Sequence, residues 1–329
     1  LYDTSCQWAI DIMGCLKSIG DKCGVEFEAA IGGTDPEQTI QAVQNFGAAG
    51  YNGIINLHPG TIMAKLVEIC EQYGMYIVTS NDPSSLSADY ASFSSNPYFV
   101  GEVWEDETRI AKDIVDEMYK AGARNFALHG FPEGLSAQMD TRLIAAREEI
   151  QTYSDAKIVT EGLSFDKAGA AEDILAQFGD QVDAIFSSVE TVSTVYQPLI
   201  NAGKSGKIQL NCYDPNKDAL AAFKDGTLTF ATTGTCADSM IAFVLLYNAM
   251  EGHKMMTVDN SVPSINMSYI ICRSAEDFET AINYCSADNP PYTFNELEPY
   301  MQADSKLDEL RAFAEAFSLD DIAVRRGEK

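Results

Sequence analysis

The sequence predicts an α/β protein built of two Rossmann-like, three-layer lobes, each with a parallel sheet between two layers of helices. Two observations indicate this fold class. Short apolar stretches alternate with amphipathic stretches of helical period along most of the chain, which is typical of parallel strands joined by right-handed helical crossovers. The 329 residues suit two medium domains better than one, and 46% hydrophobic content is ample for packed cores.

The first series of elements opens with an amphipathic helix over 6–23 that ends at Gly24. The alternating stretch 25–33 is predicted to be a strand. Asp35 suits a helix N-cap and Pro36 the first helical position, so a helix is expected from there to Gly50. The elements predicted next are a strand over 51–58, a helix over 61–74, a strand over 75–80 and a strand over 98–103.

A second series of strands and helices continues the same alternation. The predicted strands cover 125–130, 156–162, 183–188, 207–213 and 228–234. The predicted helices cover 106–121, 137–151, 167–178, 191–202, 215–225 and 237–251. A last strand is expected within 263–274, and the tail to Lys329 is acidic and mostly helical.

Charge limits the kinds of partner. The chain has 49 acidic and 22 basic residues and a formal net charge of −27, which repels nucleic acid and anionic lipid, so we expect no nucleic-acid partner. No apolar run approaches the ~18 residues that span a bilayer, and no leader pattern stands at Leu1. Either the chain is cytosolic or a targeting segment has been removed.

The eight cysteines form no C-x-x-C pair and no zinc-site spacing with histidine. We therefore expect no metal and no cofactor, and interpret most cysteines as small buried hydrophobes.

Motifs typical of enzymes are missing too. The stretch 201–207 resembles a phosphate loop, but Pro198 stands where the first glycine is needed. No G-x-S-x-G elbow occurs, so we expect a protein without catalytic activity.

Polar or aromatic residues stand at or just past the ends of several predicted strands. Ligands of open parallel α/β sheets bind at the carboxyl ends of the strands, so these residues indicate a binding site. For any one of them, Asp214 above all, a helix N-cap is the alternative. The residues are Asn81, Asp82, Trp104, Glu190, Asp214 and Thr235.

The order and spacing of five motifs, "IVTSND", "LSAQMDTR", "SFDKAG", "IFSSVE" and "LNCYDPN", resemble those of type I periplasmic solute-binding proteins of the ribose and galactose-binding kind. The resemblance covers residues 1 to about 274. It implies two lobes joined by a three-segment hinge, with the ligand held between them. We expect one lobe to comprise 1–103 and 236–262, and the other 104–235 and 263–329.

The resemblance also implies which residues contact the ligand. Trp8 and Phe165 correspond to aromatic walls, Arg142 to a family arginine and Asp214 to the pocket aspartate. The other positions that match the family's site are Cys6, Asn81, Asp82, Glu190 and Thr235. Asp82 replaces a basic residue and Val189 an asparagine, so the hydroxyl pattern of a known sugar cannot be transferred.

The family's first strand is nearly missing, because only Leu1 and Tyr2 precede the first loop. Either upstream residues have been left out of the sequence, or the first lobe lacks an element that normally lies centrally in its sheet.

Three of these residues could have a purely structural role in place of ligand binding. Trp8 and Trp104 could serve ordinary packing, and Arg142 could form a surface ion pair with Asp140 or Glu149. The pocket candidates add up to three carboxylates against one guanidinium. Because burying such an imbalance is costly, a neutral sugar or a cationic, hydroxyl-bearing ligand is favoured over an anion.

The sequence thus predicts a monomeric, extracytoplasmic solute-binding protein, in the periplasm or at the cell surface, that delivers a small polar ligand to the permease of an ABC importer. A lipid anchor stays open. The alternative is a ligand-sensing receptor that feeds a sensor kinase or chemoreceptor. The effector half of a sugar-responsive repressor has the same fold, but the acidic balance argues against it.

Overall fold

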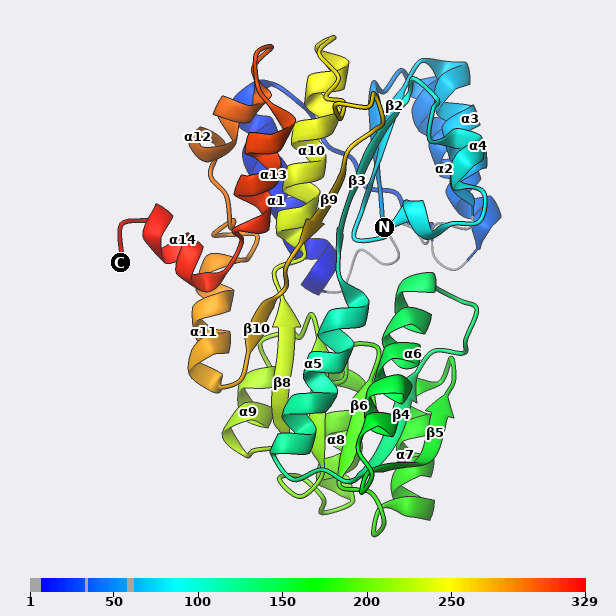
Figure 1. The fold of residues 1–329 in the computed structure, drawn as a ribbon, viewed down its shortest axis with the longest axis vertical. Helices are drawn as coiled ribbons and strands as arrows, with labels where there is room; N and C mark the ends of the chain where they lie inside the picture. Colours follow the sequence, from blue (N-terminus) through cyan, green and yellow to red (C-terminus); the bar gives the residue numbers. More distant parts are fainter. Residues whose placement is uncertain (1–6, 33–34, 58–61) are drawn as a thin grey trace. The chain divides into compact units, whose positions relative to one another are not determined.

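The computed structural model describes residues 7–32, 35–57 and 62–329. The chain divides into two compact units. Unit 1 comprises the described parts of Leu1–Glu105, Gly234–Ser268 and Asn283–Lys329, and unit 2 comprises Asp106–Thr233 and Tyr269–Ile282. Each unit is an α/β structure with a mainly parallel sheet, which confirms the predicted fold class (Figure 1).

The described strands of unit 1 form a parallel sheet in the order β1-β2-β3-β9. They are β1 (Gly53–Asn56), β2 (Tyr76–Ser80), β3 (Phe99–Glu105) and β9 (Ser264–Met267). The inner strands β2 and β3 are almost completely buried. This agrees with their near-continuous apolar sequences, because a parallel strand covered by helices has no water-facing side.

Helices cover both faces of this sheet, with α1 and α10 on one side and α2 and α3 on the other (Figure 1). Helix α10 is apolar and buried over nearly its whole length, as expected for a helix enclosed on all sides. The helices of unit 1 are α1 (Gln7–Cys23), α2 (Pro36–Ala49), α3 (Met63–Tyr73), α4 (Tyr90–Phe93), α10 (Cys236–Met250), α12 (Phe294–Leu297), α13 (Leu307–Glu315) and α14 (Leu319–Arg325).

Unit 2 has a sheet in the order β10-β8-β7-β6-β4-β5, parallel except for β10 at one edge. Its strands are β4 (Asn125–Gly130), β5 (Lys157–Leu163), β6 (Ala184–Ser187), β7 (Gln209–Tyr213), β8 (Leu228–Thr233) and β10 (Ile270–Cys272). Its helices are α5 (Glu107–Lys120), α6 (Ala137–Thr152), α7 (Lys167–Phe178), α8 (Gln197–Asn201) and α9 (Ala219–Lys224), with a π-helical turn over Val192–Tyr196. Helix α11 (Ala275–Tyr284) runs past the boundary at Ile282.

Helix α2 has the ends that the sequence predicts. The Asp35 carboxylate accepts a hydrogen bond from the N–H of Glu37 at 3.0 Å, and Pro36 occupies the first helical position. Gly50 terminates the helix with φ 87°, a left-handed conformation that suits glycine because it has no Cβ.

Three features differ from the expectation. No strand is assigned over 25–32, because no described strand lies beside this segment to form a ladder with it. The single strand expected in 263–274 is two strands, β9 in unit 1 and β10 in unit 2. The tail Asn283–Lys329 belongs to unit 1, not to the second lobe.

The C-terminal tail, Asn283–Lys329, is held in place by a hydrogen bond to α10 and by aromatic contacts within the tail itself. The side-chain amide of Asn248 in α10 donates to the carbonyl of Tyr300 at 2.8 Å. Within the tail, the rings of Tyr292 and Phe313 are 4.9 Å apart. Sequence periodicity predicts helices there, but not which core they cover.

Candidate ligand-binding site

The loop after β2 carries two of the predicted residues, Asn81 and Asp82, and both are buried. Asn81 adopts φ 64°, a left-handed conformation that asparagine tolerates better than most residues. Its side-chain amide donates to the carbonyl of Thr235 and to the Asp238 carboxylate, each at 3.2 Å. The structure therefore brings the predicted residues Asn81 and Thr235 together at the start of α10.

A buried glutamate that sequence reasoning missed anchors the same loop. Glu102 on β3 is fully buried, and one carboxylate oxygen accepts from the Ser84 hydroxyl at 2.7 Å and the Ser85 N–H at 2.8 Å. Its other oxygen accepts from the Ser264 hydroxyl at 2.6 Å. Hydrogen bonds to an ionised group are about twice as strong as neutral ones, so Glu102 fixes the path of the chain next to Asp82.

Trp104 belongs to this network. Its indole N–H donates to the Ser264 hydroxyl at 3.0 Å, and the side chain is half-buried on β3. This contact supports the packing interpretation of Trp104. Trp8 lies half-buried in the first turn of α1, and Cys6 lies outside the described residues.

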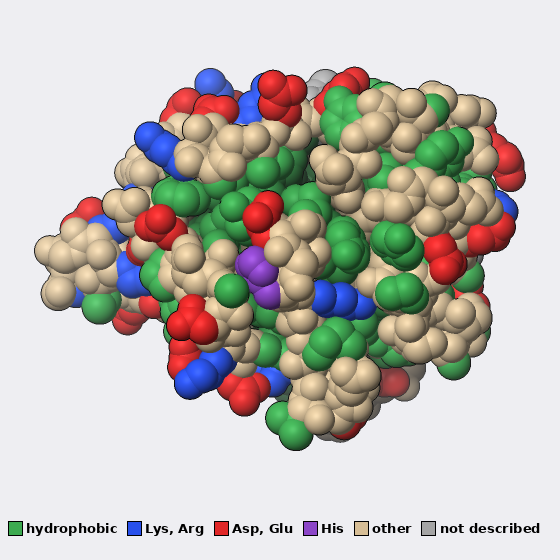
Figure 2. All heavy atoms as spheres, turned by 90° about the horizontal axis from the view of Figure 1, so that it is seen from above, with side chains coloured by type: hydrophobic (Ala, Val, Ile, Leu, Met, Phe, Trp, Pro, Cys, Tyr) green, Lys and Arg blue, Asp and Glu red, His purple; other side chains and the backbone are tan. Residues whose placement is uncertain are grey.

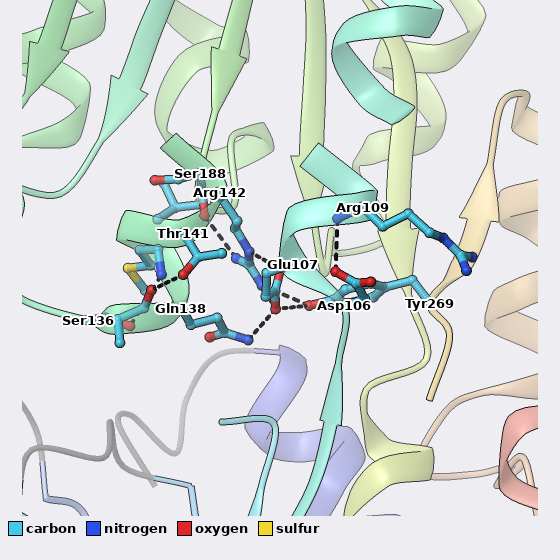
Figure 3. A network of polar contacts seen from close by, with 12 residues as sticks. Asp106, Glu107, Arg109, Ser136, Gln138, Thr141, Arg142, Ser188 and Tyr269 are labelled. Atoms are coloured by element: carbon cyan, nitrogen blue, oxygen red, sulfur yellow. Dashed lines mark hydrogen bonds and ion pairs between the residues drawn. The ribbon is translucent and has the colours of Figure 1, made fainter. Parts of the chain in front are cut away.

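In unit 2, Arg142 on α6 is the centre of a buried polar network (Figure 3). Its guanidinium pairs with both carboxylate oxygens of Glu107, at 2.6 and 2.8 Å. It also donates to the Ser188 carbonyl at 2.9 Å and to the Tyr269 hydroxyl at 2.8 Å. The predicted alternative of a surface ion pair with Asp140 or Glu149 is wrong, because Arg142 is only 5% exposed and its partner is Glu107.

The network keeps Arg142 charged. Burial by itself would lower the pKa of Arg142, but the Glu107 carboxylate and the Tyr269 hydroxyl raise it well above its ordinary value. The Tyr269 hydroxyl donates in turn to Glu107 at 2.7 Å. Arg142 makes four hydrogen bonds from its five N–H groups, so at most one N–H group remains for a ligand.

Arg142 also reaches the two strand ends that carry the predicted acids of unit 2. The Ser188 carbonyl that it contacts directly precedes Val189 and Glu190, and its guanidinium lies 3.7 Å from the ring centre of Tyr213, the neighbour of Asp214. The residues that sequence reasoning missed here are Glu107, Gln138, Tyr213 and Tyr269.

Glu190 and Asp214 differ in local structure. Glu190 accepts the Ser193 N–H at 3.1 Å and also the Ser193 hydroxyl, so it caps the turn that follows β6. Asp214 directly follows β7 with φ 45°, whereas α9 begins at Ala219 with Asp218 at its N-cap position. The N-cap interpretation therefore fits Glu190, although the element that it caps is a π-helical turn and not an α-helix. It does not fit Asp214.

Phe165 stands apart from these groups. It follows β5, its ring centre lies 6.1 Å from that of Phe131, and it is 64% exposed. An exposed phenylalanine of this kind contributes little to a core, and its ring is available to cover an apolar surface.

Two units with parallel sheets, each carrying polar residues past its strand ends, define the class of two-lobed α/β binding proteins. A family model described as "Periplasmic binding protein domain" matches residues 2–254. The chain belongs to this family of extracytoplasmic solute-binding proteins. A search of curated protein sequences finds no match.

Solved structures share the fold at low identity. A periplasmic solute-binding protein of an ABC transporter from Actinobacillus succinogenes, with bound D-allose, has a TM-score of 0.71 and 16% identity over 84% of this chain and 97% of that one. A twin-arginine translocation pathway signal protein from Burkholderia phytofirmans gives 0.76 and 12% over 91% and 94%. The Caulobacter myo-inositol binding protein gives 0.68 and 16% over 84% and 93%.

The described surface adds two observations. None of the helices in the described part of the chain is long and apolar enough to cross a membrane. On the face that Figure 2 shows, acidic side chains are spread among basic and uncharged ones, and the side chains coloured there form no continuous basic patch.

Proposed function

We propose that the protein captures a hydroxyl-rich, neutral or cationic small molecule, a sugar or other polyol, and delivers it to the permease of an ABC importer. The ligand is held between the two units, which close around it by bending at the chain crossings between them. Family membership and the fold shared with sugar- and inositol-bound proteins support this proposal.

The observation that carries the ligand class is the pairing of Arg142 with Glu107. A carboxylate or phosphate ligand is best held by the two parallel N–H groups of a guanidinium, and here both oxygens of Glu107 take that role. Glu190 and Asp214 follow neighbouring strands and add negative charge. Hydroxyl or ammonium groups of a ligand are therefore better matched than an anion.

Aromatic and carboxylate side chains recognise different parts of such a ligand. Phe165 and Trp8 cover apolar faces of the ring, and Asp82 and Asp214 accept hydrogen bonds from hydroxyl groups. Asn81 and Thr235, already joined by a hydrogen bond, hold the loop that carries Asp82. Cys6 and Trp104 are the remaining candidate ligand-binding residues that the sequence predicts.

Thermal-shift measurements with D-allose, myo-inositol and D-galacturonate test the ligand class. A matching neutral probe at 100 times its Kd stabilises the fold by about 2.7 kcal/mol, whereas galacturonate gives no shift. A shift with galacturonate alone would contradict the argument from Arg142. Addition of the probe should also reduce the radius of gyration in solution scattering.

Two variants test the site once a probe binds. Asp82→Ala should weaken affinity by ~1.5–3 kcal/mol, the range of a charge-assisted hydrogen bond. Asp214→Asn should chiefly speed dissociation in stopped-flow measurements, because its bonds hold the closed state. Asp218→Asn, an exposed change just before α9, is the control and should leave both quantities unchanged. Equal affinity in all three would reject the site.

Delivery to a permease predicts a monomer outside the cytoplasm, free in the periplasm or anchored at the cell surface. Light scattering should give the mass of a single chain of 35.9 kDa. Purified permease in nanodiscs should bind the protein more tightly in the presence of the probe that stabilises it. Equal binding with and without that probe would contradict delivery.

A further inference from the structure

Three cysteines that the proposed function does not use are buried inside unit 1. Cys15 lies in the middle of α1, Cys236 is the first residue of α10, and Cys285 directly follows α11 at the start of the tail. Each of them is at most 5% exposed. They are far apart in the sequence, so only the fold can bring them together.

One face of α1 holds the segment that follows α11. Asp11, Gly14 and Cys15 are spaced by three and four residues, which places them on the same side of the helix. The Asp11 carboxylate accepts from the N–H of Ala287 at 2.9 Å. The Cys15 thiol donates to the carbonyl of Ser286 at 3.5 Å. A Cβ atom added to Gly14 would lie 2.3 Å from that of Ala287, so glycine is what allows the start of the tail to lie this close to α1.

The first residue of α10 reaches the same place. Helix α10 packs on α1 (Figure 1), and the thiols of Cys236 and Cys15 are hydrogen-bonded to each other. This hydrogen bond and burial raise the pKa of Cys236 well above its ordinary value, and the neighbouring Cys285 and Asp11 raise it further. The three thiols therefore form one cluster, in which Cys15 and Cys236 are in direct contact.

The described members of this cluster are not arranged as a metal site. Within the described part of the chain, no group of three or more histidine, cysteine, aspartate or glutamate side chains could hold a metal ion. A disulfide needs only two cysteines whose sulfur atoms can approach to about 2 Å. Cys15 and Cys236, both thiols in this structure, come from two helices that pack on one another. One covalent bond between them would join α1 to α10.

Cys70 is a buried cysteine of the same unit in a different environment. It lies on α3 and is completely buried, and burial alone raises its pKa to about 12. Among the described residues, no second thiol contributes to that pKa. A cysteine that fills space in a core needs no other thiol beside it. The contact between Cys15 and Cys236 is thus a feature that packing does not require.

The compartment of the family favours oxidation of this pair. Extracytoplasmic proteins meet disulfide oxidants, whereas the thiols of cytosolic proteins are kept reduced. We propose that Cys15 and Cys236 are a covalent modification site, at which exchange with a small disulfide of the glutathione type forms a disulfide that links α1 to α10.

The exchange takes place in two displacements. One cysteine thiolate attacks a sulfur of glutathione disulfide and releases the first glutathione thiolate. The second cysteine thiolate attacks the resulting mixed disulfide and releases the second glutathione thiolate. The two cysteines are oxidised by two electrons, one glutathione disulfide is reduced, and the two protons of the cysteines pass to the two glutathione thiolates.

This reaction belongs to the folding of unit 1. The thiolate is the reactive form, and the raised pKa of Cys236 in the folded protein keeps its thiol protonated. Both cysteines are also closed to solvent once the helices have packed. The bond should therefore form before α1 and α10 have packed completely, so refolding is the condition in which to test it.

Refolding of the full chain from urea, with either glutathione disulfide or reduced glutathione, tests the proposal. The products are blocked with iodoacetamide and digested without reduction by a protease that cleaves before aspartate, so that the cut at Asp11 separates Cys15 from Cys6. Mass spectrometry should find the peptide of Cys15 joined to that of Cys236. The oxidised protein should melt ~5 °C or more above the reduced one, because a bond between residues so distant in the sequence restricts the unfolded chain.

Two matched variants separate the bond from packing. Cys15→Ala should abolish both the joined peptide and the difference in melting temperature between the two refolding buffers. Cys70→Ala, which removes an equally buried thiol, should keep both. Because each variant is compared with itself in two buffers, the packing that the substitution removes cancels. Cys236→Ala replaces Cys15→Ala if that variant does not refold.

Three results would overturn the proposal. Refolding with glutathione disulfide that yields no joined peptide would leave the cluster as packed thiols. A peptide that joins Cys236 to Cys285, or one that contains Cys6, would assign the bond to another pair. Loss of the difference in melting temperature in Cys70→Ala as well as in Cys15→Ala would trace that difference to general destabilisation. None of these measurements involves a ligand, so their outcome is independent of the proposed function.

Discussion

Two buried glutamates lie close together in the sequence but are stabilised in different ways. Glu102 in unit 1 accepts hydrogen bonds from two serine hydroxyls and a backbone N–H. Glu107 in unit 2 accepts from a guanidinium and a phenol. The first carboxylate is bound by neutral donors only, whereas the second is paired with a cationic side chain.

This difference indicates which of the two carboxylates destabilises the protein more when one of its partners is removed. Loss of a neutral donor leaves a carboxylate with fewer hydrogen bonds, whereas loss of an ion-pair partner leaves a buried charge without a counter-charge. The variants below test this ranking.

The largest expected effect belongs to Arg142→Met. The change leaves Glu107 buried at 3% exposure without its guanidinium, which should lower the free energy of unfolding by ~3–5 kcal/mol in urea denaturation. Arg109→Met, on an exposed side chain of α5, should stay within about 0.5 kcal/mol.

A double variant separates charge from packing. Arg142→Met combined with Glu107→Leu should recover much of the loss, because an apolar pair replaces the ion pair without leaving a charge. If the double variant is as unstable as the single one, packing and not charge accounts for the role of Arg142.

Glu102→Gln should have a smaller effect. The amide keeps one acceptor but points an NH2 group at former donors, so unit 1 should lose ~1.5–3 kcal/mol in the same assay. Glu26→Gln, at an exposed position, serves as the control. A loss larger than that of Arg142→Met would reverse the proposed ranking.

Tyr269→Phe should lower the free energy of unfolding by less than Glu102→Gln does. The hydroxyl donates to Glu107 and accepts from Arg142, but the ion pair survives without it, so about 1 kcal/mol should be lost. Because the phenyl ring still fills the same space, an effect near that of Arg142→Met would mean that the pair depends on this hydroxyl.

The smallest effect concerns pH. His129 is completely buried on β4 between the Ser187 hydroxyl and the Lys167 carbonyl, each at 2.9 Å, and burial lowers its pKa below 6.5. The unfolded chain therefore binds a proton first, so stability is full above about pH 6.5 and falls as pH drops toward the folded-state pKa. Denaturation of wild type and His129→Gln between pH 7 and 5 measures this slope, which the variant should reduce. An unchanged slope would assign the pH dependence to other groups.

Local patterns predicted most of the elements but not their partners. The N-cap and glycine end of α2 depend on neighbouring residues and were predicted correctly. The strand over 25–33 was not confirmed in its described part, because alternation indicates sidedness while a ladder needs an adjacent strand. The split of 263–274 into β9 and β10 also depends on which sheet offers an edge, which periodicity does not reveal.

The site shows the same limit. Residues past strand ends, such as Asn81 and Asp214, could be selected from the sequence because parallel topology places them at one edge of a sheet. Glu107 could not, because an acid in the first turn of a helix is usually an exposed capping group. Its pairing with Arg142 spans 35 residues, beyond the reach of helical spacing rules.

The pairing of β3 with β9 has a consequence for the order of folding. Glu102 and Ser264 are 162 residues apart, so this edge of the sheet cannot close until most of the chain has left the ribosome. The long stretch Asp106–Thr233 can collapse earlier, because it holds five of the strands of unit 2 in one continuous segment. Unit 2 should therefore fold first during synthesis, and unit 1, with its longer-range contacts, should acquire its last strand late and slowly.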